Sequence, residues 1–295
     1  MPAQAQRDTI FVEDALILSH TEHAGDQFIM RVSAPKCARK AAPGQFAHLQ
    51  CDPQRPMRRP ISIMRVSATD GWVDFLYKRL GEGTTLLANR KAGESINLLG
   101  PIGKGFSITT SKPLLIGGGV GMPPMIFVAE RLRSQDYSPF VILGSEVPFP
   151  FSPRPSQLLV NGMQDTMPDG VIAAMPLLDD WGIPSRLASL QGYAGCHQGY
   201  VTDLARIWLD ALDDQQRSEV SLYACGPHPM LQAVVDVARE YDLPVQVSLE
   251  EFMACAVGGC AGCVVEVTSG SGTAMKRVCV DGPVFDGEKV LSYKF

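Results

Sequence analysis

The sequence has no hydrophobic stretch long enough to cross a bilayer. No apolar run reaches the roughly 18 residues that a spanning helix needs. The first residues, MPAQAQRDTI, lack the apolar core of a secretory signal. We therefore expect no membrane span and a cytoplasmic location, where cysteines are usually reduced, catalytic or metal-bound.

The sequence also lacks an excess of positive charge. It contains 26 Lys and Arg against 31 Asp and Glu, a net charge of −5, which argues against nucleic acid or an anionic membrane as a partner. Histidine is scarce, and the five histidines are dispersed, so each is expected to be a surface or structural residue rather than a general base. They are His20, His23, His48, His197 and His228. No internal repeat or low-complexity tract is present.

The 295 residues are 45% hydrophobic, enough for a sizeable core and for two or three domains. The first third contains short runs of β-branched, aliphatic and aromatic residues separated by Gly and Pro, which is typical of an antiparallel barrel or sandwich. The expected strands are Ile10–Ser19, Gln27–Ser33, Phe46–Cys51, Ile61–Val66, Trp72–Leu80 and Ser95–Leu99.

The pattern changes after Ser111 to short apolar runs, Gly-rich turns and helix-length segments in alternation. Such alternation predicts a parallel α/β unit. Strands are expected at Lys112–Ile116, Phe140–Leu143, Val171–Ala174 and Val220–Ala224, and helices at Met125–Ser134 and Pro229–Glu240. The proline-rich stretch Pro148–Pro155 is expected to be a loop and has no functional interpretation.

The last segment is rich in Cys and Gly, and small strands at Val264–Val267 and Val278–Val280 would close a compact module. The predicted fold class is therefore an antiparallel β barrel, a parallel-sheet α/β domain and a small C-terminal module rich in Cys and Gly. The predicted boundaries are 1–109, 110–247 and 248–295.

Four of the eight cysteines fall in that final segment. Four residues separate Cys255 from Cys260, two separate Cys260 from Cys263, and fifteen separate Cys263 from Cys279. This order is that of plant-type [2Fe–2S] sites, and the small residues between the first three cysteines suit a tight loop around a cluster.

Three alternatives compete with the cluster for these cysteines. A structural zinc site also takes four cysteines, but usually as two close couples, whereas Cys279 stands alone. Structural disulfides are uncommon in cytosolic chains. A chance group of buried cysteines is the third alternative.

The glycines Gly117, Gly118, Gly119 and Gly121 lie where a predicted strand meets a predicted helix. Backbone without side chains can approach a pyrophosphate, and a helix N-terminus favours its negative charge. The run GGGVG departs from GxGxxG, so a tight turn in any α/β protein is the alternative interpretation.

Three short segments of the barrel region suggest a flavin diphosphate site. An arginine beside a hydroxyl residue, as in Arg59, Pro60, Ile61 and Ser62, can bind a diphosphate and hold the flavin edge. The strand Leu76, Tyr77 and Lys78, followed by Gly83 and Thr84, could add contacts. Each segment alone could equally be an exposed strand end or turn; their order along the chain favours the cofactor interpretation.

With these residues in view, the chain resembles the ferredoxin–NADP⁺ reductase superfamily, and within it the electron-transfer subunits of dihydroorotate dehydrogenase B. The resemblance spans nearly the whole length, in the segments RRPISI, YKRLGEGT, LLGPIGKGF, LLIGGGVGMPP, YACGPHPML and SLEEFMACAVGGCAGC. It implies FAD bound through Arg59–Ser62, Leu76–Lys78 and the pair Gly83 and Thr84.

The same resemblance implies that Gly117–Gly121 faces a nicotinamide nucleotide. Cys225, Gly226 and Pro227 would then lie near the nicotinamide and flavin rings, with Cys225 as a site-lining thiol in the catalytic centre. The alternative for Cys225 is an ordinary small residue ending a strand. Cys255, Cys260, Cys263 and Cys279 would ligate a [2Fe–2S] cluster.

Two positions depart from the family pattern. Ala256 follows Cys255 where relatives often have glycine, and alanine does not adopt positive φ cheaply. Glu146 stands after Phe140–Leu143 where relatives commonly carry a basic residue. An acidic side chain repels a 2′-phosphate and can accept a hydrogen bond from a ribose hydroxyl, so NAD(H) is expected over NADP(H).

The expected function is an electron-transfer subunit that passes electrons between NAD⁺ and a flavin-containing catalytic partner, expected to be dihydroorotate dehydrogenase of pyrimidine biosynthesis, in a hetero-oligomer. Two alternatives stay open. One is a reductase subunit of another complex, such as a hydrogenase, a transhydrogenase or a glutamate-synthase-like enzyme. The other is a non-catalytic iron–sulfur redox sensor.

Overall fold

The computed structural model describes residues 9–158, 167–269 and 272–290. Residues 1–8 lie outside the described residues. The expected lack of a secretory signal depends partly on these residues. In the described part of the chain, no helix is long and apolar enough to cross a membrane.

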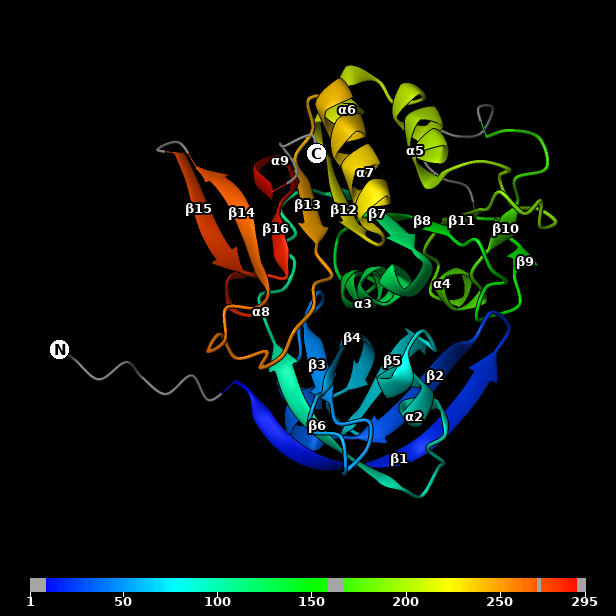
Figure 1. The fold of residues 1–295 in the computed structure, drawn as a ribbon. Helices are drawn as coiled ribbons and strands as arrows, with labels where there is room; N and C mark the ends of the chain where they lie inside the picture. The colour runs from blue at the N-terminus through cyan, green and yellow to red at the C-terminus, as the bar shows by residue number, and fades with distance from the viewer. Residues whose placement is uncertain (1–8, 159–166, 270–271, 291–295) are drawn as a thin grey trace.

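The N-terminal third forms a closed six-stranded antiparallel barrel, which confirms the expected barrel (Figure 1). Neighbouring strands run in the order β1-β2-β5-β4-β3-β6. The strands are β1 (Phe11–His23), β2 (Gln27–Ser33), β3 (Phe46–Leu49), β4 (Arg59–Ser67), β5 (Trp72–Lys78) and β6 (Ser95–Ile102). Two short helices join them, α1 (Pro35–Lys40) and α2 (Glu82–Ala88). Alternate strand residues such as Ala15, Ile17, Met30 and Val32 fill the barrel interior, as the two-residue period of a strand requires.

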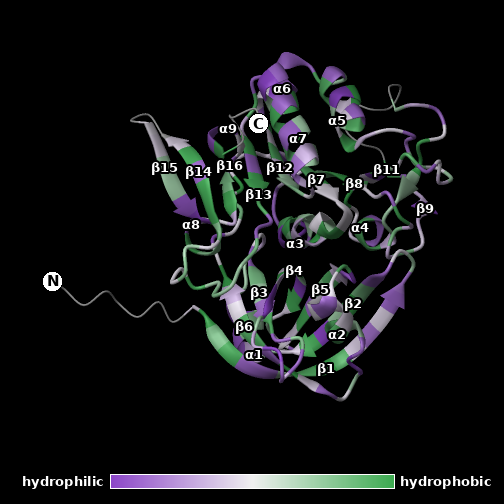
Figure 2. Ribbon diagram, viewed as in Figure 1, coloured by the Kyte–Doolittle hydropathy of each residue, from purple (hydrophilic) through white to green (hydrophobic). Residues whose placement is uncertain are grey.

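The middle of the chain forms a six-stranded sheet in the order β11-β8-β7-β12-β13-β16. The first five strands are parallel and β16 is antiparallel. The strands are β7 (Lys112–Gly118), β8 (Phe140–Gly144), β11 (Ser185–Ala188), β12 (Val220–Cys225), β13 (Val245–Ser248) and β16 (Val284–Asp286). The helices of this region are η1 (Gly119–Gly121), α3 (Met122–Leu132), α4 (Pro176–Asp180), α5 (Val201–Asp210), α6 (Asp214–Ser218) and α7 (His228–Glu240). In Figure 2, α5 and α7 each carry hydrophobic and hydrophilic residues, and their buried residues pack on the sheet.

Two expected strands were wrong. Val171–Ala174 is not the third strand of the sheet: only Ala173–Ala174 (β10) is extended, and it pairs with Arg154–Pro155 (β9) in a separate small sheet. The third strand is β11. Its polar residues Ser185 and Arg186 are buried, so the sequence does not show the apolar run expected of a buried strand. Pro148–Pro155 is otherwise loop, as expected.

The second wrong strand is Val278–Val280, which belongs to helix α8 (Val278–Asp281). The partner of β14 (Val264–Ser269) is instead β15 (Gly272–Arg277), a largely exposed strand without an apolar pattern. The chain then returns to the central sheet as β16, followed by α9 (Gly287–Val290). The predicted domain boundaries stay predictions; β16, from the last segment, completes the sheet of the middle one.

Helix α3 lies between the barrel and the sheet (Figure 1). Phe127 on α3 enters the barrel core, while Met125 and Val128 pack with the sheet. Arg65 of β4 pairs with Glu130 of α3 at 2.6 Å, with both side chains largely buried. The barrel and the sheet are therefore held together along one helix.

Candidate functional site

Arg59 and Gly83 come together at the edge of the barrel. Arg59 begins β4 and Gly83 lies in the first turn of α2. A Cβ on Gly83 would lie 2.5 Å from Nε of Arg59, so a larger residue there would displace the guanidinium. The Thr84 hydroxyl accepts hydrogen bonds from Leu80 N and Gly81 N at 3.0 and 3.2 Å and so shapes the turn. The structure thus joins two of the three segments expected to hold the FAD diphosphate.

The third segment contributes less through its side chains. Tyr77 is buried in the barrel core, and its hydroxyl is 2.8 Å from Nε2 of His20. Leu76 is buried on the opposite face, among residues of the sheet. Only Lys78 is partly exposed. Any contact from Leu76 and Tyr77 to a flavin would therefore involve their backbone. In Arg59–Ser62, Ile61 likewise points into the barrel core, while Ser62 is half-buried.

The glycine turn and Cys225–Pro227 flank the point where the strand order of the sheet reverses. β7, the first strand of the sheet along the chain, lies between β8 and β12, so successive strands are added on one side of it and then on the other. Gly117, the next-to-last residue of β7, is directly opposite Cys225, the last residue of β12. In open α/β sheets, ligands bind outside the carboxyl ends of the strands at such a switch point. The tertiary structure therefore supports a nucleotide site at the turn that the sequence predicts.

Two glycines let the loops at the switch point pack closely. A Cβ on Gly121 would lie 2.3 Å from the carbonyl oxygen of Cys225, and one on Gly118 would lie 2.4 Å from the sulfur of Met230. Gly119 has φ +54°, a conformation that favours glycine. Glycine is therefore favoured at Gly118 and Gly121 by close neighbours and at Gly119 by its backbone conformation.

The N-terminus of α3 offers fewer donors than expected. Pro123 and Pro124 occupy its first turn, and proline has no N–H. Two of the hydrogen-bond donors that a helix N-terminus usually presents to a phosphate are therefore missing. A pyrophosphate bound here would depend more on backbone N–H groups of the glycine turn than on those of the α3 N-terminus.

Cys225 is fully buried, and burial raises the pKa of its thiol above the usual value, with the Glu250 carboxylate acting in the same direction. The thiol therefore stays protonated and is not an activated nucleophile. It lies at the end of β12 opposite Gly117, with no surface exposed, so its role as a site-lining thiol stays a prediction.

Glu250 is a residue of this region that the sequence did not single out. It follows β13, next to β12 in the sheet, and its carboxylate acts on the Cys225 thiol. It is reached by solvent, yet surrounding protein raises the pKa of its carboxyl. A carboxyl group with a shifted pKa, at the end of a sheet where ligands bind, often marks a functional site. Assigning a strand to Val245–Ser248 from the sequence would have placed Glu250 at that end.

Glu146 is exposed just beyond β8, the neighbour of β7 on the side away from β12. The preceding Ser145 is buried, and its hydroxyl donates to the Val147 carbonyl at 2.7 Å, which orders the turn. Glu146 therefore lies at the same edge of the sheet as the glycine turn, where a ribose of the nucleotide would be within reach.

The four clustered cysteines act on one another. The Cys260 thiol lowers the pKa of Cys255, and the Cys263 thiol raises the pKa of Cys279. The N–H of Val278, next to Cys279, donates to the carbonyl oxygen of Cys263 at 2.9 Å. Within residues 9–158, 167–269 and 272–290, no three His, Cys, Asp or Glu side chains are close enough to share one metal ion. A zinc site needs four ligands around one ion, whereas a [2Fe–2S] cluster takes two thiolates on each iron. Cys255, Cys260, Cys263 and Cys279 are the four thiols that a two-iron cluster would take.

The backbone of the loop points N–H groups at the sulfurs. Burial tends to raise the pKa of Cys255, but the N–H groups of Val257, Cys260 and Gly259 and the Cys260 thiol lower it to about 6. Gly262 N donates to the sulfur of Cys260 at 3.4 Å. Such donors stabilise thiolates and tune a cluster.

Cys263 and Cys279 are buried, and burial together with the neighbouring Cys263 thiol raises the pKa of Cys279 to about 12. These two cysteines therefore lie inside the protein, while Cys260 is exposed. Ala256 has φ +56°, the left-handed conformation that glycine adopts more readily than alanine. Ala261 has φ +54° in the same loop.

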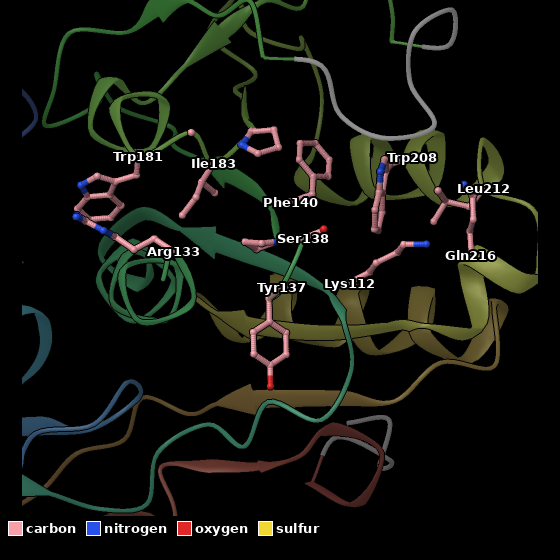
Figure 3. A pocket seen from close by; sticks show the side chains of 13 residues that line it. Lys112, Arg133, Tyr137, Ser138, Phe140, Trp181, Ile183, Trp208, Leu212 and Gln216 are labelled. Atoms are coloured by element: carbon pink, nitrogen blue, oxygen red, sulfur yellow. The ribbon is translucent and has the colours of Figure 1, made fainter. Parts of the chain in front are cut away.

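A cavity of about 280 Å³ lies away from these segments, at the amino ends of β7 and β8. Figure 3 shows Arg133 beside Trp181 on one side of it and Trp208 with Leu212 on the other. The Arg133 guanidinium lies 5.5 Å from the centre of a Trp181 ring. Because ligands of parallel sheets bind at the carboxyl ends, this cavity is separate from the candidate site.

Comparisons with known proteins agree with this geometry. Residues 250–291 match the model of the iron–sulfur cluster binding domain of dihydroorotate dehydrogenase B. The electron transfer subunit of NAD⁺-dependent dihydroorotate dehydrogenase B from Desulforamulus reducens is 32% identical, covering 95% of this chain and 98% of the relative. The corresponding subunit from Geobacillus sp. (strain WCH70) is 33% identical over the same shares.

Solved structures show the same fold. One is a chain of the NADH-dependent reduced ferredoxin-NADP oxidoreductase, whose structure was described for insights into flavin-based electron bifurcation. It is 26% identical with a TM-score of 0.74, and the match covers 94% of this chain and 90% of that one. The ferredoxin reductase in carbazole 1,9a-dioxygenase is 22% identical with a TM-score of 0.59, covering 84% and 70%.

Proposed function

Because the chain belongs to the family of electron transfer subunits of NAD⁺-dependent dihydroorotate dehydrogenase B, we propose that it carries electrons between a flavin-containing catalytic partner and NAD⁺. The cofactors are FAD and a [2Fe–2S] cluster. When bound, they supply the conversion between the hydride chemistry of a nicotinamide and the transfer of single electrons.

The observation that carries this proposal is the presence of three complementary sites in one chain. Arg59 and Gly83 form a clamp for a diphosphate at the barrel edge. The switch point between β7 and β12 offers a nucleotide site. The four clustered cysteines offer a cluster site after β13. No single one of these would specify an electron relay, but together they do.

The residues have distinct roles in this proposal. The Arg59 guanidinium binds the diphosphate of FAD, and Gly117–Gly121 with Cys225–Pro227 orient the nicotinamide nucleotide. Glu146 accepts from a ribose hydroxyl, which favours NAD(H) over NADP(H). Cys255, Cys260, Cys263 and Cys279 hold the iron, and the exposed Cys260 marks the side that a partner can approach.

Substrate chemistry belongs to the partner. The protonated Cys225 thiol cannot serve as a base, and the one histidine that adjoins the Cys225–Pro227 segment among the described residues, His228, begins helix α7. The chain therefore orients and holds the electron carriers, and the partner oxidises the substrate, which we propose is dihydroorotate, as in the relatives' names.

Anaerobic co-purification from the native source tests the proposal. We expect a tagged chain to bring down a flavoprotein, and the complex to reduce NAD⁺ when dihydroorotate is added. A complex that oxidises NADH with an artificial acceptor but ignores dihydroorotate would indicate another partner enzyme. A protein that holds FAD and iron but does not oxidise NADH would instead support a redox sensor. We also propose a cytoplasmic location, which cell fractionation checks.

A further inference from the structure

Arg65 lies at the boundary between the barrel and the α/β sheet. It belongs to β4, and its guanidinium donates from Nε and Nη2 to one carboxylate oxygen of Glu130 on α3, at 3.0 and 2.6 Å. The two side chains are 21% and 17% exposed. Charged side chains are seldom buried this far unless they are paired. This ion pair therefore joins a strand of the barrel to a helix of the sheet region.

Two indole rings also contact the Arg65 guanidinium, one from each part of the molecule. Its Cζ lies 5.6 Å from the centre of the Trp72 ring, at the start of β5, and 5.1 Å from that of Trp181, which follows α4. Cations within about 6 Å of an aromatic ring are attracted to its face. Trp72 also stacks on Arg31, and Trp181 on Arg133, which Figure 3 shows beside it. Arg65 is thus the centre of a row of alternating arginines and tryptophans that crosses the boundary.

The ion pair is held at a cost. Within the part of the chain that the structure describes, the second carboxylate oxygen of Glu130, Oε2, is buried without a hydrogen-bond partner. Taking two charges out of water is unfavourable, and a buried acceptor without a donor adds to that cost. A contact of this kind is better explained by a role in fixing how two parts of a protein fit together than by a gain in stability.

Both partners belong to elements that carry the expected cofactor segments. Arg65 follows Ser62, the end of the expected flavin segment, by three residues on the same strand. Glu130 follows Gly121, the last glycine of the nucleotide turn, by nine residues along α3. Nine residues of α-helix span about 13 Å, so a turn of α3 by about 5° at Glu130 would move the glycine turn by about 1 Å.

A displacement of this size matters for hydride transfer. The reacting atoms must approach to about 3–3.5 Å, and a misplacement of about 1 Å by a distant change can cost about 100-fold in rate. Figure 1 shows α3 directly beside β4, between the barrel and the sheet. A contact that sets the angle between these two elements therefore acts on the reaction without touching either cofactor.

We propose that Arg65 is a positioning residue: its ion pair with Glu130, beside Trp72 and Trp181, fixes α3 against β4 and so aligns the nicotinamide site with the flavin site. The inference rests on the proposed function and extends it, because it assigns this alignment to residues outside both sets of expected binding segments. Loss of the ion pair leaves each binding segment intact but loosens its placement relative to the other.

The test compares Arg65→Met and Glu130→Gln with Arg65→Lys. Methionine keeps an unbranched apolar side chain beside the indole rings but removes the charge, and glutamine removes the charge of the partner at nearly the same shape. Lysine keeps the charge and can still donate to Glu130. Arg206→Met is the matched control, because Arg206 of α5 forms its ion pair with Glu240 of α7, at 2.8 Å, wholly within the sheet region.

For each holoprotein we would measure FAD content, the Kd for NADH, the limiting rate at which NADH reduces FAD, and the long-wavelength charge-transfer absorption that stacked nicotinamide and flavin rings produce. Amide hydrogen exchange across α3 in the deflavinated protein reports how firmly the helix is held when neither cofactor is bound.

We expect Arg65→Met and Glu130→Gln to keep FAD content and the Kd for NADH within about twofold of wild type, but to lower the limiting rate by roughly tenfold or more. The charge-transfer absorption should weaken and exchange across α3 should become faster. Arg65→Lys should recover most of the rate and the absorption, and Arg206→Met should match wild type. If Arg65→Met does not fold, Glu130→Gln and Arg65→Lys decide the question.

An unchanged limiting rate and absorption in Arg65→Met and Glu130→Gln would overturn the inference. Equal losses of FAD in all the Arg65 and Glu130 variants, Arg65→Lys included, would also overturn it, because that pattern indicates a purely structural role. If wild type itself binds no FAD or is not reduced by NADH, the proposed function is wrong; if wild type is reduced and only the Arg65 effect is missing, this inference alone fails.

Discussion

Replacing Gly83 with alanine should weaken FAD binding through Arg59 alone. The new Cβ would lie 2.5 Å from Nε, 2.7 Å from Cζ and 2.8 Å from Nη2 of Arg59. Since ordinary contacts begin at 3.4 Å, the guanidinium must move by about 0.9 Å or turn away. The methyl group is small, but it occupies the place where the guanidinium is held toward a diphosphate.

The size of the effect follows from the lost contact. A hydrogen bond to a charged group contributes about 1.5–3 kcal/mol, which corresponds to a roughly 10- to 150-fold rise in the Kd for FAD. The fold should not suffer, because alanine is favoured over glycine in a helix by about 1 kcal/mol and Gly83 lies within α2. Weaker binding would therefore reflect the displaced guanidinium rather than unfolding.

Gly81→Ala is the matched control, because a Cβ at Gly81 has no atom within 4 Å and the residue has φ −151°, which alanine adopts readily. The Kd of the deflavinated protein for FAD can be measured by quenching of flavin fluorescence. Adding Gly83→Ala to an Arg59→Ala variant should cause little further loss, since the two changes remove the same contact. Wild-type affinity in Gly83→Ala, or full additivity with Arg59→Ala, would refute the reasoning.

Three further predictions concern other parts of the molecule. Cys255→Ser should lower bound iron and acid-labile sulfide to near zero, whereas Cys51→Ser, at a buried cysteine of the barrel core, should leave both unchanged; iron retained in Cys255→Ser would contradict the ligand assignment. Glu146→Gln should lower the KM for NADPH several-fold by removing a repulsive charge while changing that for NADH little; steady-state kinetics with both nucleotides decide it. The buried His48 has a pKa of about 4 against 6.5 in an unfolded chain, so the unfolded state binds more protons and about 3 kcal/mol of stability, present above pH 6.5, is lost as the pH falls toward 4. Thermal unfolding of the holoprotein should therefore depend less on pH between 7 and 4 in His48→Phe than in wild type, and parallel curves would rule this out.

The sequence by itself determined the chemistry of the sites, because that chemistry depends on residue type and short spacing. Three closely spaced cysteines among small residues predict a cluster loop, and the glycine run after an apolar strand predicts a nucleotide turn. The antiparallel barrel also followed from local patterns, since its strands alternate between a buried and an exposed face. Each of these signals lies within a few residues of chain.

The tertiary structure alone decided which of these residues meet. The proximity of Cys263 to Cys279 and the contact of Gly83 with Arg59 involve residues far apart in sequence, and no local pattern encodes such distances. The strand at Ser185–Ala188 was hidden because its polar residues are buried by neighbours that only the fold supplies. The same reason hid the burial of His48: it is one of five dispersed histidines in the sequence, but in the folded chain it is fully buried on β3, opposite Pro60 of β4.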